Sequence, residues 1–274
     1  MTLRTIASLM LLLLATSSLA AGPRIVIDSG HGGSQEGAKG PGGLLEKEVV
    51  LQISKKLRSK LEKELGAQVF LTREKDATLP LPNRVEFTNA RRPDIFLSIH
   101  ANSMPTRKLR ERIEGIETYF LSASASGARA SAVAARENAE GPASQAVEND
   151  STLNFILKDL VRMEAHAGSS RLAYFIHQQL IGATAATDRG VHQAPFFVLM
   201  GVGAPAVLVE VGYISHPEEG KRLGGADYQE KLATAITAGV KEFLSEQRKR
   251  DSGPAVAAPE TTEESPPVAS PASL

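Results

Sequence analysis

The sequence lacks cysteine and tryptophan, and each absence narrows the chemistry open to the chain. Without cysteine there can be no disulfide scaffold, thiolate metal site or cysteine nucleophile. With no tryptophan and only 5% aromatic residues, a stacking platform for sugars or bases is not expected. The formal net charge is zero, from 31 basic and 31 acidic residues, so no excess positive charge attracts nucleic acid. What remains is an enzyme or binding domain that uses histidine, carboxylate and hydroxyl groups.

The two ends of the chain are predicted to lie outside the folded domain. Residues 1–20 have the pattern of a secretory signal peptide: Arg4 is positive, residues 9–14 are apolar, and Ser18-Leu19-Ala20 is a small-x-small cleavage signal. The apolar run is short for a membrane span, so an uncleaved anchor is the weaker alternative. Residues 251–274 are rich in Pro, Ala, Ser and Glu and are expected to be disordered. An exported protein without cysteine suits a bacterial envelope.

Residues 22–248 are expected to form one catalytic or binding domain in which strands alternate with helices. A helical apolar pattern begins at Glu46 and stops at Gly66, and a shorter helix is predicted at 82–90. Short apolar runs predict strands at 24–28, 68–72, 94–99, 115–121 and 206–211. This alternation predicts an α/β fold, with a mostly parallel twisted sheet flanked by helices.

Residues 123–168 are too many for a simple crossover between two strands and predict an inserted helical segment. Residues 126–139 are rich in alanine and favour a helix. A second, amphipathic helix is expected to end near Gly168, and Ser169 or Ser170 is expected to cap the next helix at 172–180. The apolar stripe of the second helix contains Leu153, Ile156, Leu157, Leu160 and Val161.

Three potential metal ligands fall at the boundaries of predicted elements. His31 follows the first strand, Glu46 opens the first long helix, and His100 closes the third strand. Two histidines and a carboxylate are the protein ligands of a catalytic zinc site, and a glycine-rich connection allows the helix start to meet the strand end. Each residue also has an ordinary structural interpretation. These are a turn histidine, a carboxylate favoured by the helix dipole, and a hydrogen-bonded histidine at a strand end.

Glu210 is the most informative single carboxylate, because it lies in an otherwise apolar strand. A lone buried carboxylate costs several kcal/mol unless it is paired or neutralised. One interpretation is an ion pair with Arg73 or Arg84; the other is a general base that takes a proton from zinc-activated water. The remaining histidines are weaker candidates: His177 is expected at a helix surface, His166 in the insertion, and His192 and His216 in loops near a substrate.

Five motifs occur in an order that resembles one enzyme family. They are IDSGHGG together with EKEVV at 46–50, LTR at 71–73, FLSIHAN, APFFVL and PAVLVEVGYISHPEE. The chain thus resembles the zinc-dependent N-acetylmuramoyl-L-alanine amidases of the amidase-3 type from residue 24 to about 244. The resemblance implies hydrolysis of the amide between N-acetylmuramic acid and L-alanine in peptidoglycan. It also implies one Zn²⁺ per chain, held by His31, Glu46 and His100, with Glu210 as the catalytic glutamate. Departures are Ser29, Glu36 and His216, where the family often has Pro, Asp and Asn, and a basic run at 107–112.

The insertion resembles that of the cell-division members of this family, in which a helical segment covers the zinc cleft until an activator displaces it. By this resemblance residues 134–140 precede or form the cover, and Glu137 contacts zinc in the resting enzyme. The alternative is that Glu137 is a solvated helix carboxylate, and Glu140, Glu148 and Glu164 are competing candidates. The implied partner is a catalytically degenerate LytM-type activator that binds the apolar stripe. The implied location is the periplasm of a Gram-negative bacterium, with a role in cell-wall remodelling and daughter-cell separation.

Two rival functions use the same residues. A zinc carboxypeptidase or endopeptidase would cut within the stem peptide instead of at its start. A non-catalytic wall-binding module would use the same cleft without chemistry. The second rival is disfavoured because a binding module has no need of a general base such as Glu210.

Overall fold

The computed structural model describes residues 22–140 and 152–252, and for 152–164 it describes the course of the helix without the side chains. The expected signal peptide, Glu148 and the expected C-terminal tail from residue 253 therefore lie outside the described residues. The first residue of that tail, Asp251, was expected to be disordered but is the last residue of a helix. The side chains of Glu164 and of the apolar stripe from Leu153 to Val161 are also outside the description.

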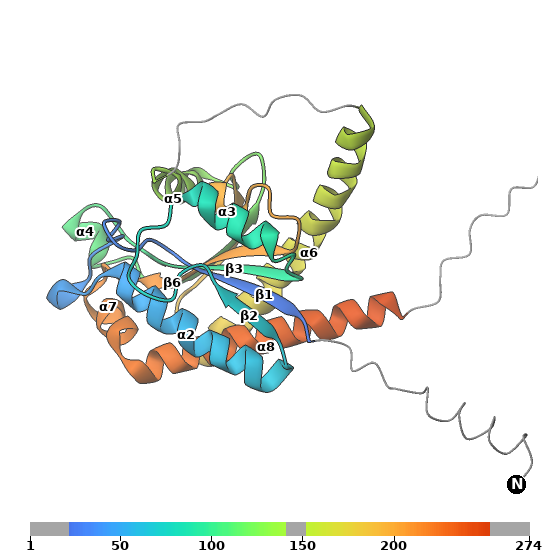
Figure 1. Ribbon diagram of the computed structural model, residues 1–274. Coiled ribbons are helices and arrows are strands. Elements are labelled where there is room, and N and C mark those ends of the chain that lie inside the picture. The colour runs from blue at the N-terminus through green and yellow to red at the C-terminus, as the bar shows by residue number, and fades with distance from the viewer. Residues whose placement is uncertain (1–21, 141–151, 253–274) are drawn as a thin grey trace, which may run out of the picture.

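Within the described residues, six strands form one sheet in the order β2-β1-β3-β6-β4-β5. The sheet lies at the centre of the domain, where β1, β2, β3 and β6 are labelled in Figure 1. Neighbouring strands are parallel except β4 and β6, which are antiparallel, so the prediction of a mostly parallel sheet is confirmed. The strands are β1 (Arg24–Ser29), β2 (Gln68–Leu71), β3 (Ile95–Asn102), β4 (Ile116–Leu121), β5 (Asp188–Ala194) and β6 (Ala206–Tyr213). The sequence pattern did not predict β5, because this edge strand is polar and mostly half-buried.

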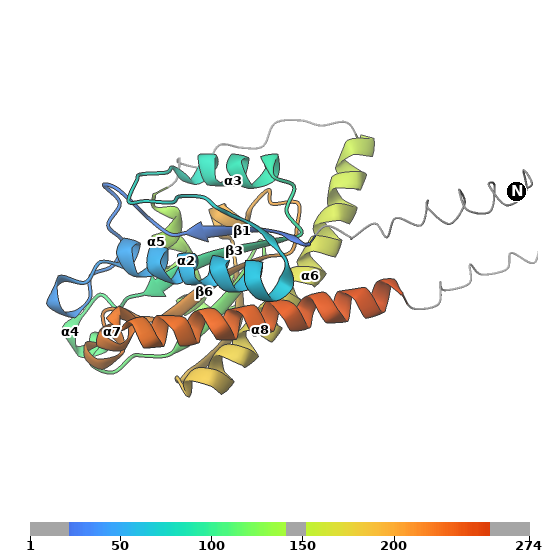
Figure 2. The ribbon, with the colours of Figure 1, turned by 60° about the horizontal axis from the view of Figure 1, so that its bottom comes forward.

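Helices cover both faces of the sheet (Figure 2). They are α2 (Glu46–Leu65), α3 (Leu81–Ala90), α4 (Arg107–Arg110), α5 (Ala128–Asn138), α6 (Thr152–Thr184), α7 (Pro217–Gly224) and α8 (Ala226–Asp251), with short 3₁₀ turns η1 (Pro41–Gly43) and η2 (Phe197–Leu199). The predicted helices at 46–65, 82–90 and 126–139 are confirmed with small shifts in their ends. Within the described residues no helix combines the length and apolarity needed to cross a bilayer.

Side chains that alternate along each strand divide the core into two clusters. Ile25 and Ile27 of β1 pack in the larger cluster, which contains residues of α2, α6 and α8. Val26 faces the opposite way, into a smaller cluster that contains residues of α3, α5 and η2. By the same alternation, His100 and Glu210 follow Phe96 and Leu208 onto the smaller, α5 side of the sheet. The candidate functional groups thus share one face.

The connection from β4 to β5 differs from the prediction at Gly168. The expected helix end at this residue is wrong, since α6 runs without a break from Thr152 to Thr184. Gly168 serves close packing: a Cβ there would lie 2.8 Å from Cγ of Pro205. Ser169 is not a cap, because its hydroxyl donates to Ala165 O within the helix and accepts from Ala206 N at 2.9 Å. The C-terminal part of the predicted insertion is therefore the beginning of the crossover helix.

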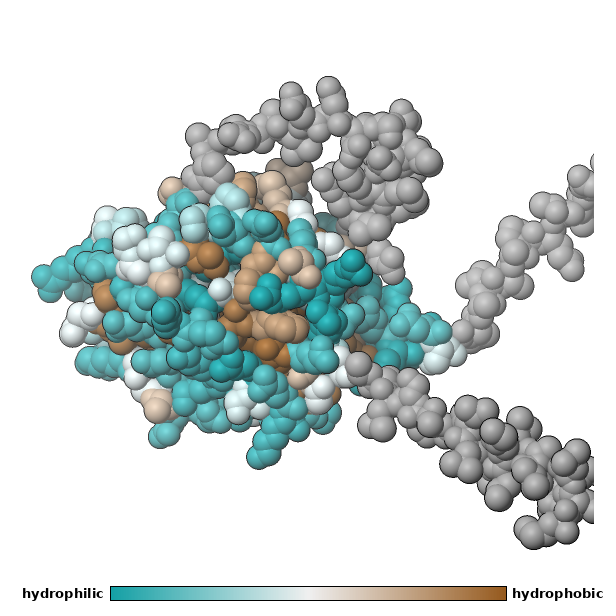
Figure 3. Space-filling view, viewed as in Figure 1, coloured by the Kyte–Doolittle hydropathy of each residue, from teal (hydrophilic) through white to brown (hydrophobic). Residues whose placement is uncertain are grey.

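The face seen in Figure 3 is mainly hydrophilic, with smaller hydrophobic areas between the polar residues. Among the described residues, the large apolar side chains with substantial exposure are Leu109, Tyr174 and Met200. These three lie on α4, on α6 and beside η2, so they are spread over different elements.

Candidate metal centre

The loop after β1 holds His31 in an unusual backbone conformation. His31 has φ of 58°, a region that non-glycine residues adopt rarely and mainly where the surroundings impose it. Two buried arginines impose it here by donating to the loop carbonyls. Arg84 Nη2 donates to His31 O at 2.7 Å, and Arg73 Nη2 donates to Gly30 O at 2.8 Å. Arg84 also pairs with buried Asp28 at 2.7 Å. The loop is thus fixed from beneath.

Two glycines allow the loop to approach the other candidate ligands. A Cβ on Gly30 would lie 2.4 Å from the ring of His100. Gly37 has φ of +69°, and a Cβ there would lie 2.6 Å from His31 and 2.7 Å from Glu46. The close approach of strand end, loop and helix start that the glycine-rich sequence predicts is therefore present.

Glu46 is the first residue of α2 and is held by two backbone amides. Its Oε2 accepts from Ala38 N at 2.8 Å, and its Oε1 accepts from Ala101 N at 2.9 Å. Ala101 follows His100 on β3, so the same carboxylate ties α2 to the strand that carries the second histidine. These bonds fix the direction of the Glu46 side chain.

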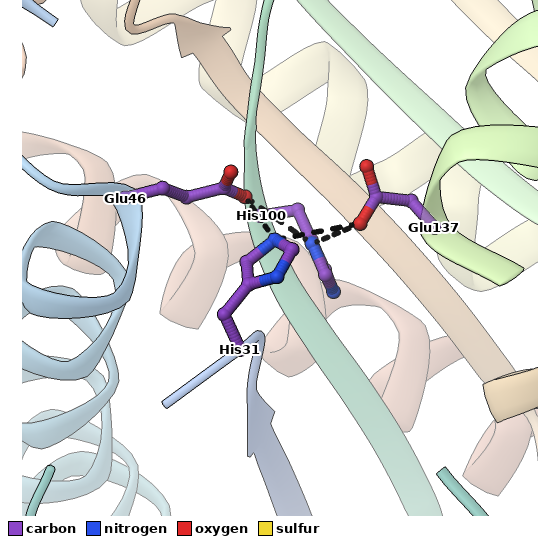
Figure 4. A group of neighbouring side chains, drawn as sticks. All are labelled: His31, Glu46, His100 and Glu137. Atoms are coloured by element: carbon purple, nitrogen blue, oxygen red, sulfur yellow. Dashed lines mark ion pairs between the residues drawn. The ribbon is translucent and has the colours of Figure 1, made fainter. Parts of the chain in front are cut away.

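Four buried side chains converge with one ligand atom each: His31, Glu46, His100 and Glu137 (Figure 4). All four atoms lie within 4.8 Å of one another. His31 Nε2 is 3.0 Å from Glu46 Oε1 and 3.5 Å from Glu137 Oε2. His100 Nδ1 is 3.3 Å from Glu46 Oε1 and 3.0 Å from Glu137 Oε2. Residues from a loop, two helices and a strand thus enclose one small space.

The convergent atoms could hold a metal ion. His31 Nε2, His100 Nδ1 and Glu137 Oε2 are buried and make no hydrogen bond. Yet each imidazole nitrogen faces carboxylate oxygens, and the Glu137 oxygen faces both imidazoles. Buried polar atoms normally have a partner, so three such atoms around one point fit a cation. Two imidazoles with carboxylate oxygens are a donor set that suits zinc, and a zinc site of this composition needs no thiolate.

Without a metal, the same crowding perturbs the titration of the histidines. Burial lowers the pKa of His31, but the Glu46 carboxylate and the bond to Glu140 outweigh it and raise the pKa to about 10. His100 behaves alike: burial lowers its pKa, and Glu137 and Glu46 raise it well above the usual range. The carboxylates therefore favour positive charge at this point, whether it is carried by a proton or by a metal ion.

Glu210 lies beside the cluster and pairs with an arginine that the sequence did not single out. It is opposite His100 in the β3–β6 register and fully buried. Arg136 Nη2 donates to Glu210 Oε1 at 3.2 Å, whereas Glu210 Oε2 has no hydrogen bond. Burial raises the pKa of Glu210 well above its ordinary value, opposed by Arg136. The expected alternative partners, Arg73 and Arg84, instead bind the loop that holds His31.

The last turn of α5 directs its polar side chains into the site. Glu137 is buried beside His100, so its alternative interpretation as a solvated carboxylate is wrong. Glu140 Oε1 is 2.9 Å from His31 Nδ1, the ring nitrogen that faces away from the cluster. Asn138 bonds backbone groups at Pro195 and Phe197. Glu140, a competing candidate from the sequence, thus reaches His31 but not the nitrogen that faces the cluster. The contacts of Arg136 and Asn138 were not predicted, because adjacent positions on a helix give no sign in the sequence of which ones reach a neighbour.

The other histidines lie away from this centre. His177 was expected at the surface, but it is buried, with Nδ1 3.1 Å from Thr118 Oγ1 and Nε2 2.8 Å from Asp188 Oδ1. His192 was expected in a loop and instead belongs to β5. His166 packs edge-on against the ring of Phe120. His216 caps α7, where its Nδ1 accepts from the backbone amides of residues 218 and 219.

Comparison with known proteins agrees with this arrangement. The family model described as N-acetylmuramoyl-L-alanine amidase matches residues 25–242. This range contains every residue of the cluster and Glu210.

Individual relatives show the same similarity. The chain is 38% identical to N-acetylmuramoyl-L-alanine amidase AmiA of Escherichia coli over 223 residues, covering 80% of this chain and 75% of that protein. It is 34% identical to N-acetylmuramoyl-L-alanine amidase AmiC of Neisseria meningitidis over 227 residues, covering 81% of this chain but 53% of that protein. Among solved structures, AmiC2 of Nostoc punctiforme matches with a TM-score of 0.62 and 30% identity, covering 81% of this chain and 97% of that one.

Proposed function

The chain belongs to the N-acetylmuramoyl-L-alanine amidase family, and on this premise we propose that it is a zinc hydrolase of peptidoglycan. The bond cut is the amide between N-acetylmuramic acid and L-alanine. The observation that carries the proposal is the convergence of buried His31, Glu46 and His100 on one point, next to buried Glu210. This set supplies three ligands and a proton acceptor, which a metal-assisted hydrolysis requires.

The mechanism assigns a separate task to each side chain. When bound, the metal supplies Lewis acidity that polarises the scissile carbonyl and lowers the pKa of water. His31, Glu46 and His100 would hold it, and the backbone bonds to Glu46 keep its carboxylate aimed at the centre. Glu210 takes the proton of the attacking water and passes it to the departing nitrogen of L-alanine. Its burial favours this role, because burial raises the pKa of Glu210 above its ordinary value and so makes the carboxylate a stronger base than an exposed one.

In the described conformation, we propose that α5 holds the enzyme inactive. Glu137 occupies the side of the cluster where a substrate carbonyl would approach, and Arg136 pairs with Glu210. The apolar face of α5, Ala130, Val133 and Ala134, is buried in the smaller core cluster. A closed state populated 99:1 needs only about 2.7 kcal/mol, which is within the contribution of such a face. Glu137 is therefore our candidate for the inhibitory zinc contact.

An activator would bind the displaced form better than the closed form. We propose a catalytically degenerate LytM-type protein as this partner, and the helical stripe from Leu153 to Leu160 as its contact. We further propose export by the signal peptide at 1–20, action in the periplasm of a Gram-negative bacterium, and a role in separating daughter cells. Relatives named as N-acetylmuramoyl-L-alanine amidases AmiA and AmiC support the amidase activity on which these proposals rest.

One experiment tests the reaction itself. Purified muropeptides would be incubated with the zinc-loaded chain carrying Arg136→Ala, a substitution that weakens the closed position of α5 over the metal cluster. The masses of the products would be measured by mass spectrometry. We expect a free stem peptide beginning with L-alanine and a sugar fragment with a free lactyl carboxylate. Release of a terminal amino acid or a cut inside the stem would instead establish the carboxypeptidase or endopeptidase. Absence of any cleavage, with binding retained, would favour the wall-binding module.

A further inference from the structure

Asn138 makes a two-point contact with the chain segment just after β5. Its Nδ2 donates to Pro195 O at 2.8 Å, and its Oδ1 accepts from Phe197 N at 2.7 Å. Within the described residues, no other hydrogen bond is seen for either backbone group. One carboxamide thus satisfies an acceptor and a donor that would otherwise be open.

The spacing of these two groups is that of a strand awaiting a parallel partner. They flank Phe196, which has an extended backbone with φ of −75° and ψ of 125°. In a parallel pair, a residue donates its N–H to the carbonyl before its partner and accepts from the N–H after it, and an extended ligand can add to a sheet edge in this way. The Asn138 carboxamide therefore presents the same donor and acceptor as one residue of an extended peptide.

The segment also lies at the candidate active site. Phe196 and Asn138 line the same small cavity as His31, His100 and Glu137. Phe196 is fully buried and packs against Tyr119, so the segment is anchored from behind. The adjoining β5 is an edge strand of the sheet. A peptide held here would run beside the metal cluster on the α5 side.

We propose that Pro195 O and Phe197 N–H form a subsite for the stem peptide of the substrate. When α5 withdraws, the two groups bind the N–H and C=O of one stem residue in an extended conformation. In the closed state Asn138 occupies this subsite in place of the peptide, while Glu137 occupies the metal cluster. The subsite gives a function to the APFFVL motif, and the proposal rests on the amidase function proposed above.

The test removes the backbone donor without removing the fold. Phe197 is the first residue of η2 and follows an extended residue, and proline is accepted at such a position. Phe197→Pro therefore deletes the N–H, and Phe197→Ala is the matched control that loses the ring but keeps the N–H. Both are made in full-length chain carrying Arg136→Ala and Asn138→Ala, so that α5 no longer occupies the subsite. Faster hydrogen exchange at the Phe197 amide verifies this opening, and thermal unfolding verifies the fold.

The probe is the synthetic tripeptide L-alanyl-γ-D-glutamyl-L-lysine, with affinity measured by calorimetry. We expect the opened chain and its Phe197→Ala form to bind with similar Kd, and Phe197→Pro to bind about tenfold more weakly, as for the loss of one buried hydrogen bond. Binding should also shift the amide resonance of Phe197. Equal Kd values for Phe197→Pro and Phe197→Ala, or no binding to the opened chain, would show that the segment only anchors α5. The ratio of the Kd of Phe197→Pro to that of Phe197→Ala measures peptide binding alone. It therefore tests the subsite even if the muropeptide assay rejects the amidase reaction.

Discussion

Arg136 of α5 donates a hydrogen bond to Glu210 of β6 at 3.2 Å, so the proposed general base is neutralised by the helix that covers it. The same guanidinium pairs with Glu137 at 2.8 Å and donates to Asn102 Oδ1 at 3.1 Å. Burial lowers the pKa of Arg136, but the carboxylates of Glu210 and Glu137 outweigh burial and raise this pKa above its ordinary value. The guanidinium therefore stays positively charged. One arginine therefore links the inhibitory carboxylate and the catalytic one.

Arg136→Ala should raise the basal rate of peptidoglycan cleavage about tenfold or more. The substitution leaves buried Glu210 without its cation in the closed state and removes one of the cationic partners of Glu137. A hydrogen bond to a charged group contributes about 1.5–3 kcal/mol. The rate would be measured by dye release from labelled peptidoglycan without an activator. Ser131→Ala, on the exposed side of the same helix, serves as the control and should not change the rate. An unchanged rate for Arg136→Ala would mean that this ion pair does not hold α5 closed.

The sequence predicted the helices and strands that bear the site residues better than it predicted the contacts of α5 with the site. The order of strand, glycine-rich loop and helix placed His31 and Glu46, and an apolar run placed His100, because period and turn residues determine these elements locally. The arginine that pairs with Glu210 was not predicted, because Arg136 is 74 positions away in the sequence and no local pattern indicates that contact. The end of a helix at Gly168 was wrong for a related reason. Gly168 packs closely against Pro205 in the folded chain, and the residues next to it in the sequence do not predict this long-range contact.

His31→Ala and His100→Ala should each remove stoichiometric zinc together with activity. Each substitution takes away one of only three proposed permanent ligands, and the cluster has no thiolate to compensate. Zinc per chain would be measured by elemental analysis after dialysis against a weak chelator. Glu137→Ala is the matched control, since it removes a carboxylate of the same cluster but leaves the three ligands, and it should retain zinc. Full zinc content in either histidine variant would refute the ligand assignment.

Glu210→Gln should keep zinc bound while kcat falls by roughly 10²-fold or more. The amide preserves the shape of the side chain but cannot accept the proton from water. The comparison is made in the Arg136→Ala background, where basal activity is measurable and the arginine no longer touches position 210. A glutamine variant with turnover near that of its parent would make Glu210 a structural carboxylate.

Arg84→Met should destabilise the fold by about 3–5 kcal/mol. It leaves Asp28 as an unpaired buried charge and releases the carbonyls of Ser29 and His31. The loss would be measured by urea unfolding, with exposed Lys63→Met as the control. If Asp28 is the reason, adding Asp28→Asn should recover part of the loss; a double variant that unfolds as easily as Arg84→Met would assign the effect to the loop carbonyls instead.

The pH dependence of this difference follows from Asp28. Burial raises its pKa, but Arg84 and Thr72 outweigh burial and hold the pKa below the ordinary 3.8. A carboxylate with a lowered folded pKa stabilises the protein above the unfolded value and loses that contribution as pH falls through the folded one. The unfolded state of the two chains is the same, so the stability gap depends only on their folded pKa values. It should be full near neutral pH, begin to narrow as pH falls through the pKa of Asp28 in Arg84→Met, which unopposed burial raises, and go on narrowing down to the lowered pKa of the native chain.

Replacing residues 127–151 with a Gly/Ser linker should give an enzyme that is active without an activator and does not respond to one. The boundaries follow from the fold. Ser126 is kept because its Oγ accepts from Gln193 N on β5, and α6 is kept whole because Ser169 and the residues around it pack against β6. A deletion that continued to Gly168 would cut this crossover helix, so loss of activity there would report misfolding instead of regulation.

The linker removes Arg136, Glu137 and Asn138 together, which opens Glu210, the metal cluster and the Phe197 amide at once. We expect basal cleavage at least as fast as that of Arg136→Ala, with zinc content close to that of the intact chain and thermal unfolding that remains cooperative. A folded, zinc-loaded variant that is no faster than the intact chain would show that α5 is not an inhibitory cover.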